Sequence, residues 1–339
     1  MTNLSELTTL HVGGRAQKVV RAKTEDELIL AVNEADESGT PLLIVGRGSN
    51  LLVSDAGFNG TVIVVETEGN SYEIDACSGG MLQVAAGVDW DKFVAFTLEK
   101  NLANLESLSG IPGTVGAAPI QNIGAYGHEV SEVIARLRTY DRFEKSVKTF
   151  TADQCLFSYR DSLFKQSKER YVILDVTFQL RRGEKSLPIK YKELADALGV
   201  AIDERVPTHD VREAVLALRA KKGMLYNETL PNWSAGSFFV NPIVSESEAG
   251  GLPADAPRWA QEDGSVKLSA AWLMEHAGVS KGESLNGAKI SDAHVLALTN
   301  GGDATTADIL TLARSARARV QEKFGITLNP EVRIVGVEL

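Results

Sequence analysis

The chain has 339 residues, a formal net charge of −10, and 44% hydrophobic and 24% charged residues. This length exceeds one ordinary hydrophobic core and favours two or three domains, and the composition excludes fibrous repeats and wholesale disorder. The negative charge argues against broad nonspecific binding of nucleic acid or anionic membrane, although a local basic pocket could still bind a phosphorylated ligand.

The N-terminal residues 1–7 contain no basic segment followed by an apolar one, so we expect no secretory signal and a cytoplasmic protein. The long uncharged stretch Ser107–Tyr126 is interrupted by prolines and glycines, which disfavours a membrane helix. Cys77 and Cys155 are far apart and have no metal-ligand spacing. We therefore expect both cysteines to be reduced and packed in the interior, and no metal site. We also expect no membrane or nucleic-acid partner, and a monomer.

The first region alternates helix and strand patterns. Thr24 and Glu27 form a capping-box pair before an amphipathic run, which predicts a helix. The apolar runs 42–45, 51–53 and 61–65 predict short strands around a glycine-containing turn.

From about Tyr72 short strands predominate, including Met81–Ala86 and Tyr171–Leu180, and a helix is expected over Asp89–Leu98. Asp210 and Glu213 are expected to cap a helix that runs through Ala220.

The last region predicts helices over Ser269–Gly278 and from Thr305 to a closing glycine, Gly325. A final strand is expected over Val332–Val337. The acidic stretch Ser245–Asp263 contains Pro and Gly and predicts a surface loop.

Two glycine-rich segments are the first candidates for a ligand site. Gly46–Asn50 follows a strand, but it lacks the third glycine and the following helix of a Rossmann fingerprint. Ser109–Ala117 is a second such segment and continues into Gln121–Gly127, where Gln121 and Asn122 could offer amide groups to a polar heterocycle. Small residues let backbone N–H groups approach phosphate, but they also permit close structural packing. Spacing alone leaves both interpretations open.

Six ordered blocks resemble the UDP-N-acetylenolpyruvoylglucosamine reductase family along nearly the whole chain. The blocks are Thr9–Gly14, Val45–Leu51, Ser109–Gly127, Tyr159–Lys165, Ala235–Pro242 and Asn329–Arg333. The resemblance implies an α+β protein with an FAD-binding fold of the vanillyl-alcohol oxidase (PCMH) type in two subdomains, followed by a C-terminal α/β substrate domain. We place these domains at residues 1–67, 68–215 and 216–331, with the final strand, 332–339, returning to the first.

In this family FAD takes hydride from NADPH and delivers it to C3 of the enolpyruvyl ether, after which C2 receives a proton. The resemblance therefore implies FAD and NADPH as cofactors and UDP-N-acetylglucosamine enolpyruvate as the small-molecule substrate. Such chemistry needs a cation and an acid near the carboxylate, and a proton donor opposite the flavin. By family position, Arg160 would stabilise the enolate, Ser237 would protonate C2, and Glu331 would be the acidic partner at the enolate.

Other residues are carried over from the same blocks. Tyr126, Tyr191, Lys222 and Asn241 are expected to contact substrate, with Lys221 as the neighbouring alternative to Lys222, because the sequence departs from the family after this lysine. His294 receives no catalytic role. The expected FAD-binding residues are Val45, Gly46, Arg47, Gly48, Ser49, Asn50, Leu51, Ser109, Gly110, Ile111, Pro112, Gly113, Val115, Gly116, Ala117, Gln121, Asn122, Gly124, Ala125, Tyr126 and Gly127.

Two alternatives belong to other functional classes. One is an FAD-dependent oxidase on the same scaffold, although neither glycine segment contains the His or Cys to which such oxidases often attach the flavin. The other is a non-catalytic protein that binds a UDP-sugar or flavin, against which the presence of Arg160, Ser237 and Glu331 together argues.

Overall fold

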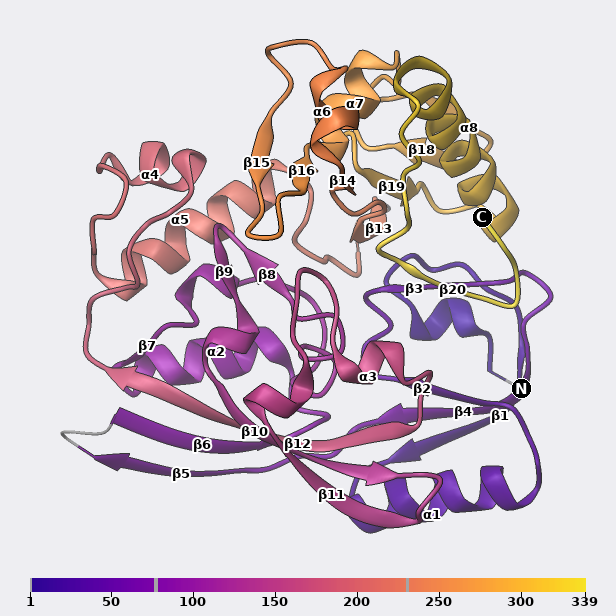
Figure 1. Cartoon of the computed structure of the whole chain (residues 1–339). Coiled ribbons are helices and arrows are strands. Elements are labelled where there is room, and N and C mark those ends of the chain that lie inside the picture. Colours follow the sequence, from indigo (N-terminus) through magenta and orange to yellow (C-terminus); the bar gives the residue numbers. More distant parts are fainter. Residues whose placement is uncertain (1, 76–78, 230–231) are drawn as a thin grey trace. The chain divides into compact units, whose positions relative to one another are not determined.

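The computed structural model describes residues 2–75, 79–229 and 232–339, so Cys77 lies outside the described residues (Figure 1). The chain forms two compact units. The larger unit comprises Gln17–Arg47 and Asn59–Lys221, and the C-terminal unit comprises Met1–Ala16, Gly48–Phe58 and Lys222–Leu339. This division differs from the expected boundaries, because it groups the N-terminal segment and residues 48–58 with the C-terminal residues.

The larger unit begins with a small sheet in the order β1-β4-β2, in which β2 and β4 are parallel. The buried face of helix α1 includes Leu28 and Val32, which belong to the same hydrophobic core as Ile63 of β4. The bounds are β1 Ala16–Ala22, α1 Glu25–Glu37, β2 Leu42–Val45 and β4 Phe58–Val65.

A second, antiparallel sheet of the same unit has the order β11-β10-β12-β6-β5, and β7 pairs with β12. Trp90, Phe93 and Phe178 pack together between this sheet and helix α2, with ring centroids 4.9 Å apart for the two phenylalanines. The strands of this sheet are β5 Asn70–Asp75, β6 Gly79–Ala85, β7 Leu102–Ala103, β10 Ile134–Asp141, β11 Ser146–Thr151 and β12 Tyr171–Arg182. A separate antiparallel hairpin is formed by β8 Gly124–Ala125 and β9 His128–Glu129. The helices are α2 Trp90–Glu99, α3 Leu163–Gln166, α4 Lys192–Leu198 and α5 Thr208–Lys221, with 3-10 turns at Glu106–Leu108, Val130–Glu132 and Ala152–Cys155.

The C-terminal unit contains sheets in the orders β13-β19-β18-β17 and β14-β16-β15, and a parallel pair formed by β3 and β20. Helix α8 packs Ile309, Ala313 and Ala316 into the core of this unit. The elements are a 3-10 turn at Leu4–Leu7, β3 Leu51–Val53, β13 Trp233–Ser237, β14 Ile243–Val244, α6 Glu246–Gly250, β15 Arg258–Ala260, β16 Val266–Leu268, α7 Ala270–His276, β17 Ser284–Leu285, β18 Ala288–Ile290, β19 Ala297–Asn300, α8 Thr306–Phe324 and β20 Arg333–Val335.

Local capping signals located the starts of four helices correctly. The side chains of Thr24, Asp89, Ser269 and Thr305 accept N–H groups at the starts of α1, α2, α7 and α8, as predicted, and Gly325 ends α8 with φ 72°. The prediction that Asp210 and Glu213 cap a helix is wrong, because α5 already begins at Thr208.

The expected surface loop over Ser245–Asp263 is mostly exposed, but the stretch also contains a helix and a strand. Ser245 and Glu248 form a capping box at α6, and Arg258–Ala260 pair with β16 as β15. The final strand, β20, is shorter than the expected Val332–Val337.

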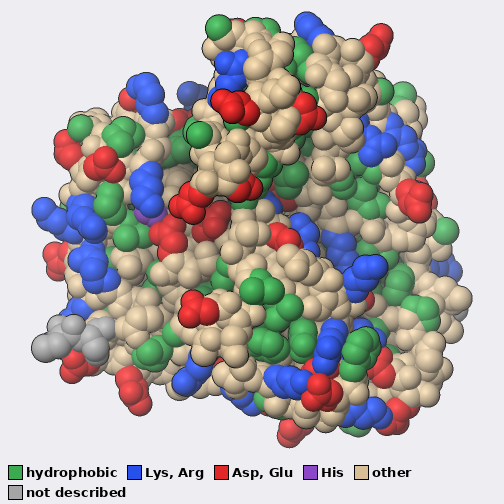
Figure 2. All heavy atoms as spheres, viewed as in Figure 1, with side chains coloured by type: hydrophobic (Ala, Val, Ile, Leu, Met, Phe, Trp, Pro, Cys, Tyr) green, Lys and Arg blue, Asp and Glu red, His purple; other side chains and the backbone are tan. Residues whose placement is uncertain are grey.

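Charged side chains of both signs are interspersed on the face drawn in Figure 2. Both signs of charge therefore contribute to the electrostatic potential of this face. In the described ranges of the chain, no helix is both long and apolar enough to cross a membrane.

Candidate active site

The two glycine-rich segments approach each other within the larger unit at Gly46 of the first and Thr114 of the second, whereas Gly48–Asn50 belong to the C-terminal unit. A Cβ built on Gly46 would lie 2.6 Å from the hydroxyl oxygen of Thr114, so the close approach of these loops requires glycine at position 46. Arg47 forms an ion pair with Asp89 (Nε to Oδ2, 3.2 Å), and Asp89 forms an isolated bridge with Thr114. Residues 46–47 and 110–114 therefore form the two sides of one loop cluster.

This loop cluster fits the phosphate-binding role expected for FAD. Gly110 and Gly113 have positive φ values, 70° and 141°. Glycine adopts such backbone conformations without steric cost. Gly113 and Thr114 are buried, and no acceptor for their backbone N–H groups occurs among the residues that the structure describes. Buried N–H groups without a protein partner are the donors that a pyrophosphate would satisfy.

Two expected FAD residues of this loop have polar groups that are used inside the protein. The N–H of Gly110 donates to Asp91 (2.6 Å), and the hydroxyl of the fully buried Ser109 donates to the carbonyl of Glu106 (2.7 Å). These groups hold the loop in shape.

Arg160 lies at the tip of a two-residue turn. Ser158 and Asp161 close the turn by two reciprocal backbone hydrogen bonds of 3.1 Å, and Arg160 adopts φ 55°. The guanidinium donates to the carbonyl of Gly124 (Nη2, 2.8 Å) and, more weakly, to that of Asn122 (Nη1, 3.5 Å). The arginine is thereby held against the second part of the expected flavin block.

The side chain of Asn122 is fully buried and bonded within the protein. Its amide nitrogen donates to Glu129 (2.6 Å) and to the carbonyl of Ser158 (3.1 Å), and its oxygen accepts the N–H of Ser131 (3.1 Å). The expectation that this amide is offered to a heterocycle therefore has no support in the geometry.

Tyr126 and Tyr191 lie together, with ring centroids 5.9 Å apart and an edge-to-face angle of 84°. Burial raises the pKa of Tyr126 to about 12, against the opposing charge of Arg219. Both rings therefore remain neutral and can present a hydroxyl donor.

Arg219 is a residue that the sequence interpretation missed. Its Nε donates to the carbonyl of Gly110 (3.0 Å), and burial lowers its pKa. The only local signal is its position on the predicted helix three residues before Lys222, which does not distinguish it from an ordinary basic residue near a helix C-terminus.

Ser237 and Glu331 belong to the C-terminal unit and lie on paired backbone segments. The N–H of Glu331 donates to the carbonyl of Phe238 (2.8 Å), and Phe239 forms a bridge with Pro330. Asn50, from the first glycine segment, donates to the carbonyl of Glu331 (3.1 Å).

The remaining predicted contacts fall in both units. The Asn241 side chain accepts the first N–H of α7, from Ala270 (2.9 Å). Lys221 is the exposed last residue of α5, whereas Lys222 follows it and is half-buried. The ring of His294 accepts the N–H of Leu296 (3.3 Å), in keeping with a structural histidine. Among the described residues, no group of three or more His, Cys, Asp or Glu side chains could hold a metal.

Two family profiles together cover most of the chain. Residues 16–147 match an FAD binding domain, and residues 228–335 match the UDP-N-acetylenolpyruvoylglucosamine reductase C-terminal domain. The FAD profile ends within the unit that contains the loop cluster, and the second profile contains Ser237 and Glu331. The fold is thus an α+β FAD-binding fold of the vanillyl-alcohol oxidase type with a C-terminal substrate domain.

Proteins named UDP-N-acetylenolpyruvoylglucosamine reductase align with this chain over nearly its full length. The UDP-N-acetylenolpyruvoylglucosamine reductase of Cutibacterium acnes is 53% identical over 98% of this chain and 89% of its own, and that of Thermobifida fusca is 47% identical over 99% and 97%. The solved structure of the Thermus caldophilus enzyme is 25% identical, covers 98% of this chain and 97% of its own, and has a TM-score of 0.68. The chain belongs to the UDP-N-acetylenolpyruvoylglucosamine reductase family.

Proposed function

We propose that this flavoenzyme, which uses FAD and NADPH, reduces the enolpyruvyl group of UDP-N-acetylglucosamine enolpyruvate to give UDP-N-acetylmuramate, with Arg160, Ser237 and Glu331 as its catalytic residues. Family membership along nearly the whole chain supports the reaction, which belongs to peptidoglycan precursor synthesis. FAD, when bound, supplies at C3 the hydride that it receives from NADPH.

Arg160 would stabilise the negative charge that develops on the enolate. Guanidinium is permanently charged, and its planar fork of donors matches a carboxylate. The hydrogen bond to Gly124 fixes the orientation of this fork before substrate arrives, which is the condition for electrostatic stabilisation without reorganisation.

Ser237 would donate the proton to C2, and Glu331 would act as the acid beside the enolate. The observation that carries this assignment is the 2.8 Å bond from the N–H of Glu331 to the carbonyl of Phe238, because Phe238 directly follows Ser237. A serine hydroxyl is a weak acid, so its proton transfer requires neighbouring groups that stabilise the alkoxide.

The substrate contacts are proposed on the same basis. Tyr126, Tyr191 and Asn241 would bind the sugar nucleotide by neutral hydrogen bonds, and Lys222 would bind its diphosphate by charge. The half-buried position of Lys222 favours it over the exposed Lys221. The bound FAD would contact the loop cluster that contains Gly46 and Thr114.

We also propose that the protein acts in the cytoplasm as a monomer. UDP-sugars and NADPH are soluble metabolites, which supports the location. The large exposed apolar side chains, such as Leu30, Phe143 and Trp259, come from separate elements, which supports a monomer. A molar mass near 36.5 kDa by light scattering would agree with it.

The visible spectrum of the purified protein tests the reaction directly. Under anaerobic conditions, NADPH should bleach the flavin bands, and UDP-N-acetylglucosamine enolpyruvate should restore them. Reoxidation by oxygen alone, with no response to the enolpyruvyl compound, would instead support the oxidase alternative.

Ser237→Ala tests the proton donor. We expect flavin reduction by NADPH to remain near the wild-type rate while reoxidation by substrate slows by ~10²–10⁴-fold, the usual contribution of one positioned proton transfer. Stopped-flow absorbance separates the two half-reactions. Ser315→Ala, on α8, is the matched control and should change neither rate. Equal loss in both half-reactions would refute the assignment.

A further inference from the structure

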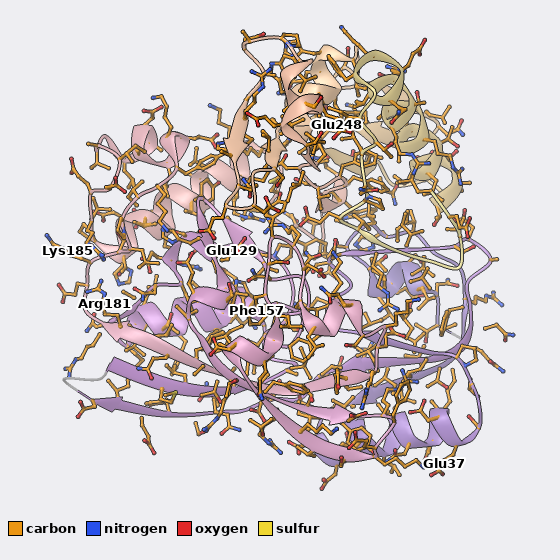
Figure 3. The ribbon with its side chains drawn as sticks, viewed as in Figure 1. Glu37, Glu129, Phe157, Arg181, Lys185 and Glu248 are labelled. Atoms are coloured by element: carbon orange, nitrogen blue, oxygen red, sulfur yellow. The ribbon has the colours of Figure 1, made fainter. Side chains whose placement is uncertain are left out.

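Asn122 connects the turn that carries Arg160 to the hairpin formed by β8 and β9. Three polar partners surround its fully buried side chain: the Glu129 carboxylate, the Ser158 carbonyl and the Ser131 N–H. The asparagine amide nitrogen carries two N–H donors and its oxygen is an acceptor, so the three bonds engage both the NH₂ group and the oxygen. Glu129 is labelled in Figure 3 and lies on β9.

The backbone of Asn122 also contributes to this arrangement. Its φ of 45° lies in the left-handed region, which asparagine tolerates better than most residues. Its N–H donates to Pro119 (3.2 Å), and its carbonyl is one of the two that accept from Arg160. The same residue therefore bonds to the guanidinium through its carbonyl and to the base of the turn, at Ser158, through its amide.

Two further contacts fix the turn at its other side. The Ser162 hydroxyl donates to the carbonyl of Ile120 (2.6 Å), and Lys165 donates to the carbonyl of Arg160 (2.8 Å). Neither contact reaches the guanidinium, which donates to the carbonyls of Asn122 and Gly124 and also lies over the ring of Tyr159, 5.3 Å from its centroid.

We propose that Asn122, anchored by the carboxylate of Glu129, is a positioning residue for Arg160. Asn122 sets the path of the backbone from residue 122 to residue 124, and that path places the two carbonyls that orient the arginine. This inference rests on the proposed function, because Asn122 would affect the reaction only through the role of Arg160 in stabilising the enolate.

Asn122→Ala tests the inference by removing all three side-chain bonds. We expect reoxidation of the reduced flavin by the enolpyruvyl substrate to slow by roughly 10²-fold, since a small misplacement of a catalytic group costs about that much. NADPH reduction of the flavin should stay within about twofold of wild type, since the guanidinium is not expected to take part in it. Flavin content per chain should be unchanged.

Asn101→Ala is the matched control, because Asn101 also has a left-handed backbone (φ 54°) but is exposed beyond α2. It should leave both half-reactions unchanged. Glu129→Gln is the second variant and decides the question if Asn122→Ala does not fold. It retains the shape of the anchor but weakens a charge-assisted bond, so reoxidation should slow measurably, by up to about tenfold.

A donor–acceptor exchange provides a sharper readout. In Asn122→Asp the carboxylate faces that of Glu129, whereas in Asn122→Asp with Glu129→Gln the amide of residue 129 can donate to residue 122. We expect the double variant to reoxidise faster than the single Asn122→Asp variant. If the substitutions acted only by damaging the structure, the double variant would instead reoxidise no faster than the single variant.

Arg160→Lys separates this inference from the proposed function. If Arg160→Lys leaves reoxidation unchanged, the proposed role of the arginine fails. If Arg160→Lys slows reoxidation but Asn122→Ala and Glu129→Gln do not, the arginine's role stands and the positioning inference is overturned. Equal slowing of both half-reactions by Asn122→Ala would also overturn it.

Discussion

Gly124 illustrates how closely single residues are constrained around Arg160. A Cβ at this position would lie 2.9 Å from the carbonyl oxygen of His128 and 3.1 Å from Nη1 of Arg160. The first neighbour is backbone and cannot rotate away, so any larger residue must move the β8–β9 hairpin or the guanidinium.

Gly124→Ala should therefore impair both stability and catalysis. We expect the free energy of unfolding to fall by about 1–3 kcal/mol through overpacking, and substrate reoxidation of the flavin to slow more than NADPH reduction does. Thermal unfolding and stopped-flow absorbance measure the two effects. Gly250→Ala, in α6, has no atom within 4 Å of the added Cβ and is the control. A Gly124→Ala protein with wild-type stability would show that the loop relaxes freely.

At the level of elements, helix α5 is bound to the glycine segment by charged side chains. Asp91, in the first turn of α2, accepts both terminal nitrogens of Arg212 (2.7 and 2.8 Å) and the N–H of Gly110. Arg219, two turns further along α5, bonds to the carbonyl of Gly110. Both polar groups of Gly110 are thus held by helices, which fixes the loop next to Gly113.

Removing the Asp91–Arg212 pair should weaken FAD binding. We expect Asp91→Asn and Arg212→Gln each to raise the Kd for FAD by about tenfold, with a coupling energy of roughly 0.5–3 kcal/mol in a double-mutant cycle. Fluorescence titration of the apoprotein measures the affinity. Lys192→Gln breaks the highly exposed ion pair with Asp196 and should have no effect. If the free-energy losses of FAD binding in the two single variants simply added in the double variant, Asp91 and Arg212 would not act as a pair.

Sequence reasoning succeeded for elements whose ends are set locally. Thr24, Asp89 and Thr305 accept N–H groups three residues further on, so the pattern that predicts each cap is contained in four residues. The partners of Arg160 lie 36 and 38 residues away in the chain, and no local periodicity predicts such bonds. Family resemblance identified Arg160 but not the role of Asn122, which depends on three-dimensional packing.

At the scale of the whole molecule, the proposed catalytic residues come from both units. Arg160 lies in the larger unit, and Ser237 and Glu331 lie in the C-terminal unit. The chain passes from one unit to the other after Ala16, Arg47, Phe58 and Lys221. Each unit therefore includes segments that are far apart in the sequence, which the three domain boundaries expected from the sequence do not separate in this way.

The larger unit also contains a charge network, exposed at Lys145 and Glu37 and buried at Asp141, that should control the stability of the molecule in acid. Helix α1 is connected to the sheet by Arg138–Glu25 (2.8 Å), Arg142–Asp36 and Lys145–Glu37 (2.8 Å), the last of which is labelled at Glu37 in Figure 3. Next to these pairs, the fully buried Asp141 accepts hydrogen bonds from Arg170, and an ion pair joins it to Lys148 (3.0 Å).

Asp141→Asn should reduce stability at neutral pH by an amount that disappears in acid. Hydrogen bonds from Arg170 and Lys148 and from the N–H groups of Phe143 and Glu144 hold the pKa of Asp141 well below its ordinary value. A depressed folded-state pKa stabilises the protein above the unfolded pKa of about 3.9, and this contribution is lost as the pH falls below it. We expect a difference of about 2 kcal/mol in urea unfolding between pH 5 and 7, typical of hydrogen bonds to a charged group, and a shrinking difference below about pH 4. Asp153→Asn, at an exposed carboxyl, should give curves that follow the wild type throughout. A difference that stayed constant down to pH 3 would mean that Asp141 stabilises the fold through its shape and not through its charge.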